Sequence, residues 1–175
     1  DSAGVRRPPL SLVLVALLGT GCASAGTLTG PAAFPGAPAS GATPRSATAD
    51  PLVHAVTQTA LSYVGTPYRL GGDDPSSGFD CSGLVRYALG QHQLDFPRTV
   101  AEQFAVGRAV SRREVQTGDL VFFSTIGPGA THVGIVVNPH DASFVHAPAT
   151  GGVVRVEHLD TTYWASRFVG ARRLF

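Results

Sequence analysis

The sequence has 175 residues, enough for one ordinary domain with extensions but too few for two full domains and a signal region. Charged residues make up 14% of the chain and the formal net charge is +1, which argues against a nucleic-acid-binding protein. Hydrophobic residues at 43% exclude a disordered chain, whereas 21 Gly and 13 Pro indicate many turns or a linker.

Residues 1–21 have the layout of a secretory signal peptide. Arg6 and Arg7 form a positive n-region, and the apolar run from Leu10 to Leu18 is too short to span a bilayer. We therefore expect the protein to be exported.

The next segment, Leu18-Gly19-Thr20-Gly21-Cys22, resembles the lipobox of bacterial lipoproteins, in which the cysteine is acylated. Gly19 departs from that pattern, and an ordinary signal peptide with a chance cysteine is the alternative. If Cys22 is lipidated, Ala23 resembles the signal for sorting to the outer membrane. The protein is then expected to be an outer-membrane lipoprotein that faces the periplasm.

Residues 22–50 read as the lipidation site followed by a flexible linker. From Ser24 to Asp50, every residue except Leu28, Phe34, Arg45 and Asp50 is Ala, Gly, Pro, Ser or Thr. Such a segment has too little apolar surface to offset the entropy lost on ordering. A folded domain over residues 51–175 would be tethered to the membrane through this linker and its lipid.

Three helices are expected in the first half of this domain. Asp50-Pro51 is a good N-cap and first turn, and the apolar spacing that follows predicts a helix up to Gly65. A second helix is expected to begin at 80–82 and to end at Gly90. Thr99 and Glu102 form a capping box for a short third helix that ends at Gly107.

Beyond the third helix the apolar period changes from 3.6 to 2, which is typical of strands. The expected strands are Val121 to Phe123, His132 to Val137, Phe144 to His146, Val153 to Glu157 and Phe168 to Leu174. Helices followed by strands predict an α+β fold with a mostly antiparallel sheet of about five strands.

Cys81 is the candidate nucleophile. If Cys22 is acylated, Cys81 has no partner for a disulfide, and it lies at a loop-to-helix transition where the helix terminus stabilises a thiolate. We therefore expect a lowered thiol pKa, with Asp80 acting as a helix cap or as a ligand for a substrate amine. A buried core cysteine and a bridge from Cys22 to Cys81 are the alternatives.

A nucleophilic thiol also needs a base, and His132 and His146 are the histidines that a hairpin would bring together. A turn centred on Pro139 pairs His132 with His146 and Gly134 with Phe144, which puts both imidazoles on one face of the sheet. A slip of one residue would put them on opposite faces.

Several motifs together resemble the NlpC/P60 family of cell-wall cysteine peptidases, from about Leu52 to the C-terminus. They are Gly65-Thr66-Pro67-Tyr68, Gly71-Gly72, Gly78 to Val85, Pro97-Arg98, Gly118 to Phe123, His132 to Ile135 and Val145-His146-Ala147. The resemblance implies a papain-like α+β fold.

The same resemblance implies the roles of individual residues. Cys81 would be the nucleophile, His132 the general base and acid, and His146 the residue that orients His132. Tyr68 would help to form the oxyanion site, and Asp80 and Ser82 would line the pocket for the substrate's amino end.

Three departures from the family pattern are Phe96, Thr117 and a slightly long hairpin. The long hairpin leaves His140 or Asp141 as competitors of His146. Capping, turn or salt-bridge roles explain Arg98 and Asp119 at least as well as catalysis does.

The implied activity is hydrolysis of an amide bond in a peptidoglycan stem peptide, by a monomer that uses no metal and no cofactor. The bond is the γ-D-glutamyl to meso-diaminopimelate link or the D-alanyl to meso-diaminopimelate crosslink. Alternatives are a catalytically silent wall-binding lipoprotein and an amidase or acyltransferase with the same Cys and His pair. A metal site built from Cys81, His132 and His146 is disfavoured, because it lacks the close ligand pairing of a structural zinc motif.

Overall fold

The computed structural model describes residues 50–149 and 152–175. The predicted signal peptide, the lipidation of Cys22 and the linker before Asp50 lie outside these residues. Within the described ranges, no helix is both long enough and apolar enough to cross a membrane.

Within residues 50–149 and 152–175, four α-helices form where short polar side chains cap the backbone. Their bounds are Pro51–Ser62 (α1), Cys81–Gly90 (α2), Val100–Ala105 (α3) and Thr162–Ala165 (α4), with a 3₁₀ turn at Arg112–Glu114. Asp50 accepts a hydrogen bond from the Leu52 N–H, and Thr99 with Glu102 forms the predicted capping box. α1 ends at Ser62, three residues before the Gly65 at which it was predicted to end, and Val64 beyond it is exposed.

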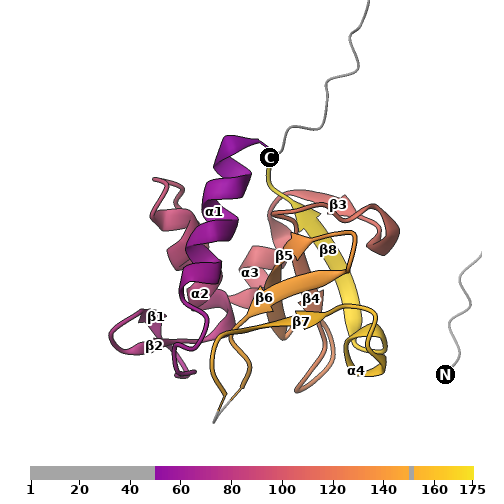
Figure 1. The fold of residues 1–175 in the computed structure, drawn as a ribbon. Helices are drawn as coiled ribbons and strands as arrows, with labels where there is room; N and C mark the ends of the chain where they lie inside the picture. Colours follow the sequence, from indigo (N-terminus) through magenta and orange to yellow (C-terminus); the bar gives the residue numbers. More distant parts are fainter. Residues whose placement is uncertain (1–49, 150–151) are drawn as a thin grey trace, which may run out of the picture. The chain divides into compact units, whose positions relative to one another are not determined.

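The strands form a two-stranded hairpin and a six-stranded antiparallel sheet (Figure 1). The hairpin joins Asp73–Asp74 (β1) to Gly78–Phe79 (β2). The sheet has the order β3-β8-β4-β5-β6-β7. Its strands are Arg108–Val110 (β3), Leu120–Phe123 (β4), His132–Asn138 (β5), Ser143–His146 (β6), Arg155–His158 (β7) and Phe168–Arg173 (β8).

Both faces of the sheet are buried, and each has its own apolar core. Leu120 and Phe122 of β4 pack with α1 and α2, whereas Phe123 points to the opposite face with Trp164 of α4. Figure 1 shows α1 and α2 on one side of the sheet and α4 beside the start of β8. The prediction of an α+β fold with a mostly antiparallel sheet is therefore confirmed.

Some short elements were absent from the prediction. Strands β1, β2 and β3 have two or three residues and α4 has four, which is too short for an apolar period to appear. β7 begins at Arg155 rather than Val153, because Val153 forms only an isolated bridge with Pro67.

Candidate active site

Cys81 is the first residue of α2, directly after its N-cap. The Asp80 side chain accepts a hydrogen bond from the Gly83 N–H at 2.7 Å, so Asp80 has the capping role expected of it. Gly83 allows the preceding loop to lie against this turn, because an added Cβ would sit 2.0 Å from the Gly72 carbonyl oxygen. Cys81 is a free thiol with 9% of its surface exposed.

The electrostatics of this thiol differ from the prediction. The pKa of Cys81 is raised to about 11, mainly by burial and in smaller part by the negative charge of Asp80. The backbone N–H groups of Val133, Ser82 and Cys81 act in the opposite direction but do not compensate. The expected fall in pKa is therefore wrong, because desolvation outweighs the helix terminus and Cys81 rests as a neutral thiol.

The rate at which iodoacetamide alkylates Cys81 is expected to rise about tenfold per pH unit from pH 7 to pH 10, since only the thiolate reacts. Mass spectrometry of the peptide that contains Cys81 measures this rate and separates it from any reaction at Cys22. A rate that reaches a plateau below pH 8 would show instead that the sulfur is ionised at neutral pH.

A polar cluster lies next to Cys81. The Arg98 guanidinium donates to both carboxylate oxygens of Asp80, at 3.0 and 2.7 Å, and to Ser82 Oγ at 3.0 Å. Ser82 Oγ also donates to Asp80 Oδ1 at 3.1 Å. Burial alone would raise the pKa of Asp80, but hydrogen bonds from Arg98 and from backbone N–H groups hold it below its ordinary value. Asp80 therefore stays ionised, and both of its carboxylate oxygens already accept hydrogen bonds.

Tyr68 lies at the edge of the same cluster. Its backbone pairs with Phe79, two residues before Cys81. Burial raises the pKa of the Tyr68 phenol, and the negative charge of Asp80 adds to this effect. The phenol therefore keeps its proton and can donate a hydrogen bond.

His132 and His146 form a hydrogen-bonded pair with His132 Nε2 2.9 Å from His146 Nδ1. The predicted register is wrong by two residues, because Phe144 pairs with Val136 rather than with Gly134. A shift of two keeps every side chain on its face, so the two imidazoles still meet. At Gly134, between them, an added Cβ would lie 3.2 Å from His146 Cβ.

Both imidazoles are buried and neutral. Burial lowers the pKa of His132, and the neighbouring His146 lowers it further. Burial also lowers the pKa of His146, with a smaller contribution from the positive charge of Arg155. In the described part of the chain, neither ring forms a hydrogen bond with the Cys81 thiol, although Cys81 lies beside Val133, the residue after His132.

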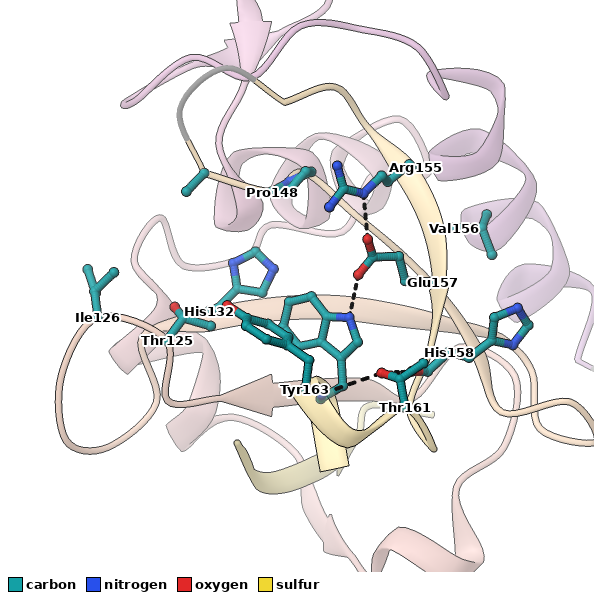
Figure 2. Close-up of a pocket in the computed structure, with 12 residues that line it drawn as sticks. Thr125, Ile126, His132, Pro148, Arg155, Val156, Glu157, His158, Thr161 and Tyr163 are labelled. Atoms are coloured by element: carbon teal, nitrogen blue, oxygen red, sulfur yellow. Dashed lines mark hydrogen bonds and ion pairs between the residues drawn. The ribbon is translucent and has the colours of Figure 1, made fainter. Parts of the chain in front are cut away.

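A groove of about 580 Å³ opens beside His132 on the α4 side of the sheet. Figure 2 shows His132 on one wall of this groove, with Glu157 facing it from β7 and Tyr163 below. The other labelled residues around it are Thr125, Ile126, Pro148, Arg155, Val156, His158 and Thr161.

The remaining candidates have structural positions. His140 and Asp141 are exposed in the turn at the opposite end of β5 from His132, so they do not compete with His146. Asp119 is buried and accepts two hydrogen bonds from Arg173, at 2.8 and 2.7 Å. In the described residues, no group of three His, Cys, Asp or Glu side chains is arranged to hold a metal ion.

Two residues that contact the histidine pair were not predicted from the sequence. The Trp164 ring stacks on His132 with a centroid distance of 5.5 Å, and Glu157 Oε2 lies 3.5 Å from His146 Nε2. Glu157 fell inside a predicted strand, but only the β6–β7 register, which pairs it with Phe144, places it on the face of His146. Trp164 belongs to the unpredicted α4.

Known proteins resemble this chain in both sequence and structure. A sequence model of the NlpC/P60 family matches residues 65–173. The chain is 42% identical over 118 residues to the murein DD-endopeptidase MepH of Escherichia coli, across 65% of this chain and 43% of that protein. It is 40% identical over 120 residues to a gamma-DL-glutamyl hydrolase of Bacillus subtilis, across 67% of this chain and 28% of that protein.

A solved structure from Staphylococcus aureus, described as similar to lipoprotein and of the NLP/P60 family, has a TM-score of 0.64 at 32% identity. The match covers 72% of this chain and 42% of that one. The predicted papain-like domain is thereby confirmed. The chain spans less than half the length of the two curated relatives.

Proposed function

Because the chain belongs to the NlpC/P60 family, we propose that it is a peptidoglycan endopeptidase that hydrolyses an amide bond of the wall stem peptide. The observation that carries this proposal is the buried His132–His146 pair, together with a free thiol at the start of α2 that lies at the backbone N–H of Val133, the residue after His132. MepH is named as a murein DD-endopeptidase, which supports the same substrate class, and the second relative is named for the hydrolysis of a gamma-DL-glutamyl bond.

In the proposed reaction, His132 is neutral at rest and acts as a general base. It does not form a thiolate–imidazolium ion pair with Cys81 beforehand. Its Nδ1, the nitrogen not bonded to His146, takes the Cys81 proton while Sγ attacks the amide carbonyl carbon. Substrate binding has to bring the thiol and the ring into hydrogen-bond range, since catalytic contacts often tighten only in the bound complex.

His132 then returns the proton to the nitrogen of the leaving amine as the C–N bond breaks, which leaves an acyl-enzyme thioester on Cys81. Water attacks this thioester, its proton passes to His132, and the acid product leaves as the thiol is restored. The Cys81 N–H and the Tyr68 hydroxyl are the donors proposed for the oxyanion, where loss of one donor typically costs about 3 kcal/mol in the barrier. Asp80 and Ser82 are proposed to line the pocket for the amino end of the substrate.

Incubation of the purified protein with isolated sacculi tests this function, with mass spectrometry of the released fragments and Cys81→Ala protein in parallel. Shortened or uncrosslinked stem peptides should appear only with the wild-type protein. Their masses distinguish the γ-D-glutamyl to meso-diaminopimelate bond from the D-alanyl to meso-diaminopimelate bond. Identical fragments from both proteins would refute the endopeptidase and leave the silent wall-binding alternative.

We further propose that the protein is exported and held at the outer membrane by a lipid on Cys22, with residues 22–50 as the tether. Peptidoglycan lies outside the cytoplasm, and a near-neutral domain gains little from electrostatic attraction to a surface. Fractionation of cells that express Cys22→Ala protein tests the anchor. A variant that stays in the membrane fraction would contradict it.

A further inference from the structure

The buried imidazole of His146 has one nitrogen that the histidine pair does not use. His146 is 0% exposed, and its Nδ1 is occupied by His132. Within the described residues, its Nε2 has no hydrogen bond of good geometry, but Glu157 Oε2 lies 3.5 Å away. The carboxylate oxygen is close enough that a small adjustment would let an N–H on Nε2 donate to it.

Glu157 is itself held in place from both sides. Arg155 Nε donates to Glu157 Oε1 at 2.6 Å, and Trp164 Nε1 donates to Oε2 (Figure 2). The Trp164 ring also stacks on His132 and meets the edge of His146, with centroid distances of 5.5 and 5.0 Å. One buried tryptophan therefore contacts the carboxylate and both imidazoles.

The position of Glu157 favours one placement of the ring protons. A carboxylate only accepts, so it favours the His146 tautomer that carries its proton on Nε2 and leaves a lone pair on Nδ1. His132 Nε2 must then be the donor of the 2.9 Å hydrogen bond, which leaves the lone pair of His132 on Nδ1. A lone pair on that nitrogen is what the transfer of the thiol proton requires.

We propose that Glu157 is a positioning residue of the active site, which sets the tautomer of His146 and, through it, the tautomer of His132. This inference rests on the proposed function of the histidine pair. Glu157 touches no reacting atom in this scheme, and it acts only through His146.

The charge of Glu157 has a second effect. When His132 takes the thiol proton, the new imidazolium is buried, and the negative charge of Glu157 raises the pKa of His132. The other groups that face this region are Arg155 on β7, whose positive charge lowers the pKa of His146, and the neutral Trp164 of α4. Removing the Glu157 charge should therefore shift the acid limb of the kcat/KM profile to lower pH.

Two variants of Glu157 distinguish the loss of its hydrogen-bond acceptor from the loss of its negative charge. Glu157→Leu removes both, and it should lower kcat about 10- to 100-fold with KM little changed, a smaller effect than losing a residue that touches the base directly. Glu157→Gln keeps an acceptor oxygen, so it should recover part of kcat while the acid limb still moves. Asp160→Asn, which removes an exposed charge nearby, should behave as wild type.

Nitrogen NMR of the histidine rings in the full chain reads the tautomers without any substrate. Wild type should show both rings protonated on Nε2, whereas Glu157→Leu should show His146 and His132 each distributed over both tautomers. Unchanged tautomers in a folded Glu157→Leu protein, or a rise in KM alone, would overturn the proposal. Absence of wall hydrolysis by wild type would refute the proposed function and leave the NMR result intact.

Discussion

Replacing His132 with alanine is expected to lower kcat for stem-peptide hydrolysis by about 10³-fold, close to the loss expected for Cys81→Ala. The thiol of Cys81, whose pKa is raised to about 11, stays protonated at neutral pH unless a base takes its proton. The leaving amine also loses its proton donor. The rate at which fragments are released from sacculi measures the effect.

The double variant separates this role from a structural one. Cys81→Ala with His132→Ala should be no slower than either single variant, because residues that act as one unit are not additive. His54→Ala removes an exposed histidine on α1 and should keep wild-type activity. A loss of less than tenfold in a folded His132→Ala protein would mean that another group accepts the proton.

Local chemistry made the helix starts predictable. Asp50 and Thr99 cap their helices through hydrogen bonds to backbone groups two or three residues away, so the sequence alone contains both partners. Asp80 caps α2 in the same way and places Cys81 at its first position.

The hairpin of the two histidines was predictable only in part. Its register depends on a bulge between Val136 and Asn138 and on Ala142, which has a φ of 56°. Nothing in the apolar alternation marks either feature. The alternation fixes only the face of each side chain, and that was enough to bring His132 and His146 together.

The thiol and its surroundings depend on contacts that are distant in sequence. Desolvation of Cys81 comes from the packing of α2 against the sheet, and the Arg98 partner of Asp80 lies 18 residues away. Glu157 reaches His146 only because β7 pairs with β6. No spacing rule within one segment predicts the desolvation of Cys81, which is why the expected direction of its pKa was wrong.

Asp80→Ala is expected to lower the free energy of unfolding by about 3 kcal/mol at pH 7, because it leaves Arg98 without its buried partner and removes the cap of α2. Urea unfolding measures this loss. Asp73→Ala serves as the comparison, since that carboxylate is 45% exposed and lies 3.1 Å from Arg86 and 3.9 Å from Arg98, where exposed ion pairs each contribute less than about 1 kcal/mol.

The pH dependence of this loss follows from the pKa of Asp80, which is lowered in the folded protein. The stabilisation is complete above the ordinary pKa of a carboxyl group and is lost as the pH falls through the lowered folded value, so wild type and Asp80→Ala should converge in strong acid. Asp80→Asn keeps a good cap but not the charge, and its loss of stability should be smaller than that of Asp80→Ala.

Because the Asp80 charge raises the pKa of Cys81, Asp80→Asn should also speed alkylation of the thiol at pH 8. Equal stability of all three proteins would show that the Arg98 pair contributes nothing, and unchanged alkylation would show that the Asp80 charge does not reach the sulfur.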